Sequence, residues 1–162
     1  LKMKDLLKKL RKYRWCHTKT SKYYSNRNKL FTIPPIIFSS ASSFVILENH
    51  QTDGTHYLSA ILSMLSAMLS GVSLHLGFNA KSECHLMSAN SYDELITKID
   101  MFIKFKKDDK EEEHRLINEL EERILKIKGC NKYQIPQWVY DLYEETHNNN
   151  NTHTNVERLS II

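Results

Sequence analysis

Two adjacent cysteine–histidine pairs are the residues of this chain whose chemistry comes nearest to that of a metal site. Cys16-His17 and Cys84-His85 each offer a thiol and an imidazole, which are side chains that zinc prefers. Neighbouring residues on a helix point about 100° apart and therefore do not share a face. Structural zinc ligands also come in spaced pairs such as CxxC, which the sequence lacks. We therefore expect no metal and no cofactor.

Catalytic motifs are also missing from the sequence. It contains no GxSxG, P-loop or HExxH pattern, and its eight histidines are scattered. We expect neither an enzyme nor a small-molecule substrate. His75 stands out because it lies inside an apolar segment, where an ionisable residue is a functional candidate. A neutral imidazole that hydrogen-bonds a serine, or that reaches the membrane interface, is the simpler interpretation.

Serines recur in the most apolar segment of the chain at steps of four, three, four and three. This spacing averages 3.5 residues, which is the contact period of a left-handed helix pair. Small residues let helices approach closely in lipid, and hydroxyls can bond across the contact. The predicted seam faces either the serines of residues 39–43 or further copies of the chain around a hydrated axis, and it leaves the leucines to face lipid. Its residues are Ser59, Ser63, Ser66, Ser70, Ser73 and Gly77.

Two long stretches without charge indicate which elements position these serines. The net charge of +4 and the hydrophobic share of 41% describe an ordinary protein, but the charges are unevenly placed. No Asp, Glu, Lys or Arg occurs in residues 30–47 or 57–78. These stretches have 18 and 22 residues, and about 20 residues span a bilayer as a helix. We predict two transmembrane helices.

The first predicted span contains Pro34 and Pro35, which disfavour a helix interior. Either the span begins before the prolines, or a helix that begins at them is short and the membrane adapts to it. Residues 48–56 are predicted to be a short loop with a turn at Asp53-Gly54. The two spans would then form a hairpin, with both chain termini on one side of the membrane.

Residues 1–29 hold eleven Lys or Arg and a single acidic residue. They predict a basic amphipathic helix that lies on an anionic surface, with lipid as the expected partner and nucleic acid as the alternative. A solvated charged helix that only sets the topology is the simpler interpretation. The positive-inside rule places this flank, and with it both termini, in the cytoplasm. The segment is too charged for a cleavable signal peptide.

Three dispersed cysteines fit reduced thiols better than a disulfide framework.

The remainder of the chain predicts further helices and a tail. Residues 79–145 carry apolar side chains at helical spacing and are expected to form a cytosolic helical region. Residues 146–162, which include four consecutive asparagines, predict a disordered polar tail. The fold class is therefore all-α: a two-helix transmembrane hairpin flanked by a basic N-terminal helix and C-terminal cytosolic helices. The alternative is a soluble bundle with the two apolar helices at its centre, as in a helical adaptor.

The order of these elements resembles the SLATT superfamily of two-span membrane proteins. The similarity covers residues 10–145 and includes a span that opens with proline and a second span that continues into a helix with a histidine–tyrosine motif. The residues that carry the resemblance are His17, Tyr24, Pro34, His85, Tyr92, Leu95 and Ile99.

The resemblance implies a membrane effector that oligomerises, forming a pore or perturbing the bilayer. Similar two-span proteins are encoded by large eukaryotic DNA viruses. The second interpretation is therefore a structural viral protein, a membrane-anchored minor capsid component in the inner membrane of a virion with capsid proteins as partners. The sequence predicts a lipid bilayer and further copies of the chain as the partners of the first interpretation.

Overall fold

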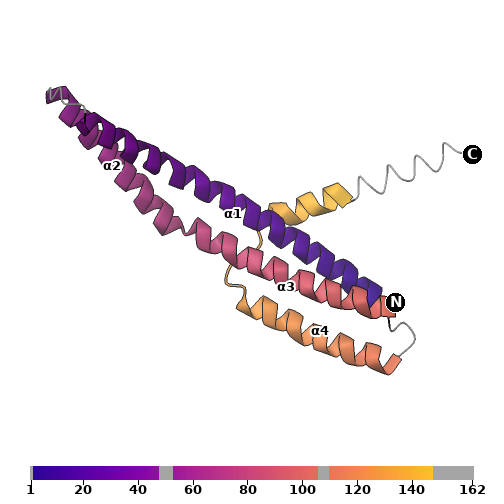
Figure 1. Ribbon diagram of the computed structural model, residues 1–162. Coiled ribbons are helices and arrows are strands. Elements are labelled where there is room, and N and C mark those ends of the chain that lie inside the picture. The colour runs from indigo at the N-terminus through magenta and orange to yellow at the C-terminus, as the bar shows by residue number, and fades with distance from the viewer. Residues whose placement is uncertain (1, 48–52, 106–109, 148–162) are drawn as a thin grey trace, which may run out of the picture. The chain divides into compact units, whose positions relative to one another are not determined.

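The described chain is almost entirely helical, which confirms the predicted all-α class (Figure 1). The computed structural model describes residues 2–47, 53–105 and 110–147, and within these ranges no strand occurs. A further short helix, over residues 137–147, follows an irregular segment. The long helices are α1 (Lys2–Leu47), α2 (Asp53–Leu76), α3 (Phe78–Phe105) and α4 (Lys110–Cys130).

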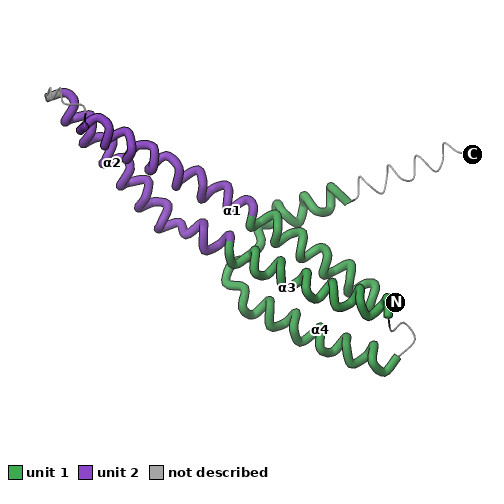
Figure 2. The backbone as a smooth tube through the Cα atoms, viewed as in Figure 1, with its two compact units in different colours: residues 1–21, 83–162 green, residues 22–82 purple. Residues whose placement is uncertain are grey.

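These helices divide into two compact units (Figure 2). Unit 1 comprises residues 1–21 and 83–162, and unit 2 comprises residues 22–82. Unit 1 holds most of the charged residues, whereas unit 2 holds both charge-free stretches.

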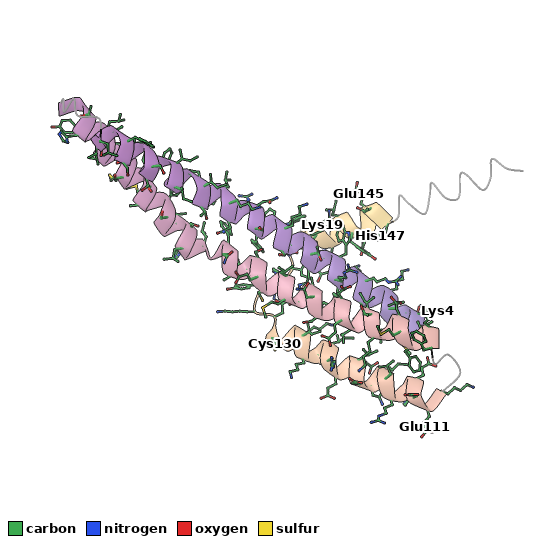
Figure 3. All side chains as sticks on the ribbon, viewed as in Figure 1. Lys4, Lys19, Glu111, Cys130, Glu145 and His147 are labelled. Atoms are coloured by element: carbon green, nitrogen blue, oxygen red, sulfur yellow. The ribbon has the colours of Figure 1, made fainter. Side chains whose placement is uncertain are left out.

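Unit 1 is a helical bundle. Its core is formed by apolar side chains that recur at helical spacing along α1, α3 and α4. Figure 3 labels Glu111 and Cys130 at the two ends of α4. The apolar side of the basic N-terminal helix, with Leu6, Leu7 and Leu10, is covered by protein here rather than left for a membrane surface. The buried core residues are Met3, Leu10, Tyr92, Leu95, Ile96, Ile99, Leu116, Ile117 and Leu120.

Surface ion pairs record the directions of the helices in unit 1. Between α1 and α3, Arg11 pairs with Asp100 at 3.4 Å and Arg14 pairs with Asp93 at 3.0 Å. The partner number falls as the α1 number rises, so the two helices are antiparallel. All four side chains are about half exposed, so each pair contributes at most about 1 kcal/mol. The core therefore supplies most of the stability.

Unit 2 is an antiparallel pair formed by the second half of α1 and α2. Pro35 lies opposite Ser66, and Ser42 lies opposite Ser59. α1 runs through Pro34 and Pro35 without interruption, so the predicted span begins before the prolines. A span of 18 residues at 1.5 Å per residue reaches about 27 Å, close to the ~30 Å hydrocarbon core.

Several predicted boundaries were wrong. The basic helix and the first span are one helix and not separate elements. Residues 53–56 begin α2, so the part of the predicted loop 48–56 that the structure describes is helical. Thr146 and His147 end the short helix instead of opening a tail. The remaining loop and tail residues lie outside the described ranges.

Gly77 separates α2 from α3, so the predicted second span is interrupted one residue before its end. Its φ of 59° lies in the left-handed region that favours glycine. The Gly77 N–H donates to the Ser73 carbonyl at 3.3 Å, and Lys81 N–H donates to the Gly77 carbonyl at 3.1 Å. A backbone in this conformation ends one helix and begins the next with little loss of hydrogen bonding.

Candidate functional site

Serine hydroxyls join the two helices of unit 2. The Ser42 hydroxyl oxygen lies 3.1 Å from both the carbonyl and the hydroxyl oxygens of Ser59, and 2.9 Å from that of Ser63. Further along α2, the Ser66 hydroxyl donates to the Pro35 carbonyl of α1 at 2.9 Å. Ser42 and Ser59 are buried, with 4% and 7% of their surface exposed. These contacts match the predicted alternative in which the seam faces the first apolar segment.

The seam itself divides into an inner and an outer part. Ser66 and Ser73 are half-buried and continue the line of Ser59, whereas Ser63 and Ser70 are exposed. The prediction that the leucines face lipid was wrong for half of them, since one set lies on the inner face between the serines. This set is half-buried and consists of Leu62, Leu69 and Leu76.

Glycines in unit 2 do not mark a close approach between helices. A Cβ added at Gly71 or at Gly77 would meet no atom within 4 Å. The assignment of Gly77 to the packing seam is therefore corrected, because its backbone conformation, and not packing space, requires glycine there.

The outer surface of unit 2 consists of large apolar side chains. Two helices of the described chain are long and apolar enough to cross a membrane, and within the most apolar 18 residues of each only 11% and 6% are buried. The core helix of a soluble bundle would instead be mostly covered. Examples on the two helices are Ile36, Phe44, Ile61, Met64 and Leu74, of which 57–86% is exposed.

Unit 1 brings together the two histidines that the sequence left 68 residues apart. The Nδ1 atoms of His17 and His85 lie 3.0 Å from each other. Both imidazoles are buried, with 3% and 0% of their surface exposed. The ring of Tyr92 lies 5.5 Å from that of His17 and is itself stacked on Tyr13 at 5.6 Å. Three residues of the family resemblance, His17, His85 and Tyr92, thus meet one another through α1 and α3.

Asn131, which the sequence analysis did not single out, orients this pair. Its side-chain nitrogen lies 3.5 Å from His17 Nε2, and its oxygen accepts from the Cys84 thiol at 3.3 Å. If the amide donates to His17 Nε2, then His17 must carry its proton on Nδ1 and donate to His85 Nδ1. The geometry therefore favours a relay of neutral groups with one direction: Cys84, Asn131, His17 and His85.

Burial keeps the groups around this relay uncharged. Loss of hydration lowers the pKa of His17 to about 4, with a smaller contribution from His85. The pKa of His85 is lowered by the same cause. Burial raises the pKa of the neighbouring Cys16 to about 11 and that of Tyr92 to about 12. Cys16 is thus a protonated thiol at neutral pH and a poor nucleophile.

A groove of about 450 Å³ opens onto this cluster. Its walls combine tyrosine rings with amides and one lysine, and no carboxylate is among the residues that line it. Within the described ranges, no three His, Cys, Asp or Glu side chains are placed to hold a metal ion. Of the relay, His17 and Asn131 line this groove, and Tyr92, whose ring lies beside His17, lines it with them.

The other residues singled out from the sequence have structural positions. Leu95 and Ile99 lie in the core of unit 1, and 1% and 0% of their surface is exposed. Tyr24 belongs to unit 2, where it is stacked on Phe78 at 6.2 Å. Pro34 is half-buried in the same unit, and His75 is exposed near the end of α2.

The chain matches no protein-family model, no curated protein and no solved structure.

Proposed function

We propose that this chain is an integral membrane protein of the SLATT type, which crosses a bilayer with the two helices of unit 2. The observation that carries this proposal is the exposed apolar surface of both helices. Side chains such as Phe44 and Leu74, 74% and 86% exposed, are favoured in hydrocarbon and disfavoured in water. The charged unit 1 then stays outside the membrane with both termini, on the cytoplasmic side that the positive-inside rule selects.

The proposed activity is self-association in the membrane that perturbs the bilayer or forms a pore. Ser59 and Ser66 bond within the hairpin, so they are occupied by α1. The exposed serines, among them Ser39 and Ser70, place hydroxyls on the lipid-facing side. Polar groups there are more favourable against another helix or water than against lipid. A second copy of the hairpin satisfies this requirement.

Membrane insertion is tested by extraction at high pH. An inserted protein stays with the membrane pellet, whereas release into the supernatant would overturn the membrane proposal and favour a soluble helical adaptor. Reconstitution into dye-filled liposomes then tests the activity. Leakage is expected from a pore, while a stably inserted protein that retains the dye would indicate a structural membrane protein.

Cysteine crosslinking tests the self-association surface. Cys84 and Cys130 are first replaced by serine, and Cys16 is buried. Ser70→Cys should form disulfide-linked dimers in the membrane. The matched control is Ser66→Cys, one turn away and turned toward α1, which should not. Equal crosslinking at both positions, or none at Ser70, would contradict the proposed surface.

A further inference from the structure

Aromatic rings and cations from two helices form a connected cluster in unit 2. The Arg27 guanidinium lies 5.3 Å over the Tyr23 ring, which meets the Tyr24 ring at 5.4 Å. Lys81, from α3, lies 5.8 Å over both the Tyr24 and the Phe78 rings. We call this the interface cluster, and its members are Tyr23, Tyr24, Arg27, Phe31, Phe78 and Lys81.

The charged residues of unit 2 beside the interface cluster all have one sign, and the nearest carboxylate in the sequence, Glu83, belongs to unit 1. Residues 22–47 contain Lys22, Arg27 and Lys29 and no carboxylate. Residues 77–82 contain Lys81 and again no carboxylate. The sequence around the cluster therefore carries four positive charges, which favour an anion beside them.

The distance of the cluster from the apolar stretch matches the position of lipid headgroups. Arg27 precedes Leu30, the first apolar residue of the stretch, by three residues, or about 4.5 Å along a helix. A bilayer adds roughly 5–7 Å of headgroup region on each side of its hydrocarbon core. Tyrosines favour the same depth. Arg27 and the rings beside it would thus lie among the phosphates.

The basic N-terminal residues are less suited to this contact than the sequence suggested. The apolar side of residues 1–21 packs into the core of unit 1, so this segment cannot also insert that side into a membrane surface. Three of its cations are paired with carboxylates, namely Arg11, Lys12 and Arg14. The structure moves the expected contact with anionic lipid toward Arg27 and Lys81.

We infer that the interface cluster is a binding site for the phosphate of an anionic phospholipid. The guanidinium of Arg27 can bond two phosphate oxygens at once, and the ammonium of Lys81 adds a second positive charge from the other helix. The rings of Tyr23 and Tyr24 hold both cations at the boundary of the apolar stretch. This inference rests on the proposed insertion of unit 2 into a bilayer.

The test compares lipid binding to the purified full chain in detergent, measured by native mass spectrometry. The probes are phosphatidylglycerol, phosphatidylcholine and inorganic phosphate. Each cation near an anionic headgroup contributes roughly five-fold in affinity. Arg27→Gln with Lys81→Gln should therefore weaken phosphatidylglycerol binding by about 30-fold. Arg27→Lys with Lys81→Arg should retain most of it, which separates lost charge from lost folding.

The charge-matched control is Lys8→Gln with Lys9→Gln, two exposed positions in the basic segment. It should change phosphatidylglycerol binding by less than about three-fold. An equal loss in both double variants would overturn the site and leave only diffuse attraction. Equal binding of phosphatidylcholine, or of inorganic phosphate at the same concentrations, would overturn the identity of the ligand.

Failure of this inference is distinguishable from failure of the proposed function. The Arg27→Gln and Lys81→Gln variant should still resist high-pH extraction from phosphatidylcholine membranes, because its apolar surface is unchanged. Extraction of the wild type would refute insertion itself. Insertion without any preference for phosphatidylglycerol would refute only the headgroup site.

Discussion

The buried imidazole pair makes the stability of unit 1 depend on pH. In the unfolded chain His17 has an ordinary pKa of 6.5, whereas in the fold burial lowers its pKa to about 4. The unfolded state therefore binds a proton between these values that the folded state does not. The stabilising contribution is complete above pH 6.5 and is lost as the pH falls toward 4. At 1.36 kcal/mol for each pH unit, the full loss is about 3 kcal/mol.

The assay is urea unfolding followed by tryptophan fluorescence. Trp15 and Trp138 both belong to unit 1, so the signal reports this unit alone. Surface carboxylates also contribute to the pH dependence of stability in acid. One example is Glu119, whose pKa is lowered by the hydrogen bond that it accepts from Lys98. The informative quantity is therefore the difference between the wild type and His17→Gln, which keeps a polar group but cannot titrate.

The wild type should lose about 2.5 kcal/mol more than His17→Gln between pH 7 and about pH 4.5. His114→Gln is the control, since His114 is exposed on α4 and its loss should leave the pH dependence unchanged. If His17→Gln weakens in acid as steeply as the wild type, the buried neutral pair is not the source of the pH dependence and the reasoning fails.

Three further changes test the packing. Leu10→Ala should destabilise unit 1 by about 2–5 kcal/mol, because Leu10 is fully buried. Leu125→Ala is the control and should change the free energy of unfolding little in the same urea titration, because its side chain is 69% exposed. Ser42→Ala should lower the free energy of hairpin dissociation in detergent by about 1 kcal/mol. Ser43→Ala is the control and should leave this free energy unchanged, because the Ser43 hydroxyl donates to the Ser39 carbonyl of its own helix. Gly77→Ala should destabilise the fold by about 1–2 kcal/mol through its positive φ, and unchanged thermal unfolding would contradict that reason.

Local patterns were enough to predict the helices and the apolar stretches. Helical spacing and the absence of charge are properties of neighbouring residues, so they survive in one sequence. The residues at which the helices begin and end could not be predicted from these local patterns. Pro34 and Pro35 lie inside α1, although isolated helices disfavour proline there. Contact with α2 stabilises this region, and the sequence around the prolines does not contain that information.

The seam illustrates why a correct period does not fix a face. Steps of four and three place Ser59, Ser66 and Ser73 on one line, and in the structure the first is buried and the other two are half-buried. Ser63 and Ser70 fit the same steps but are exposed, although the Ser63 hydroxyl still reaches Ser42. A period of 3.5 residues describes two adjacent lines, and only the partner helix decides which residues of those lines it covers.

The sequence alone determined an all-α protein with two helices apolar enough for a membrane, because both properties depend on residues close together in the chain. The tertiary structure decided the contact of His17 with His85, and the cluster in which the adjoining rings of Tyr23 and Tyr24 link Arg27 to Lys81. Members of each pair lie more than fifty positions apart, and burial gives the imidazoles their neutral state. Such properties arise from packing, since desolvation and distant contacts exist only after the helices have assembled.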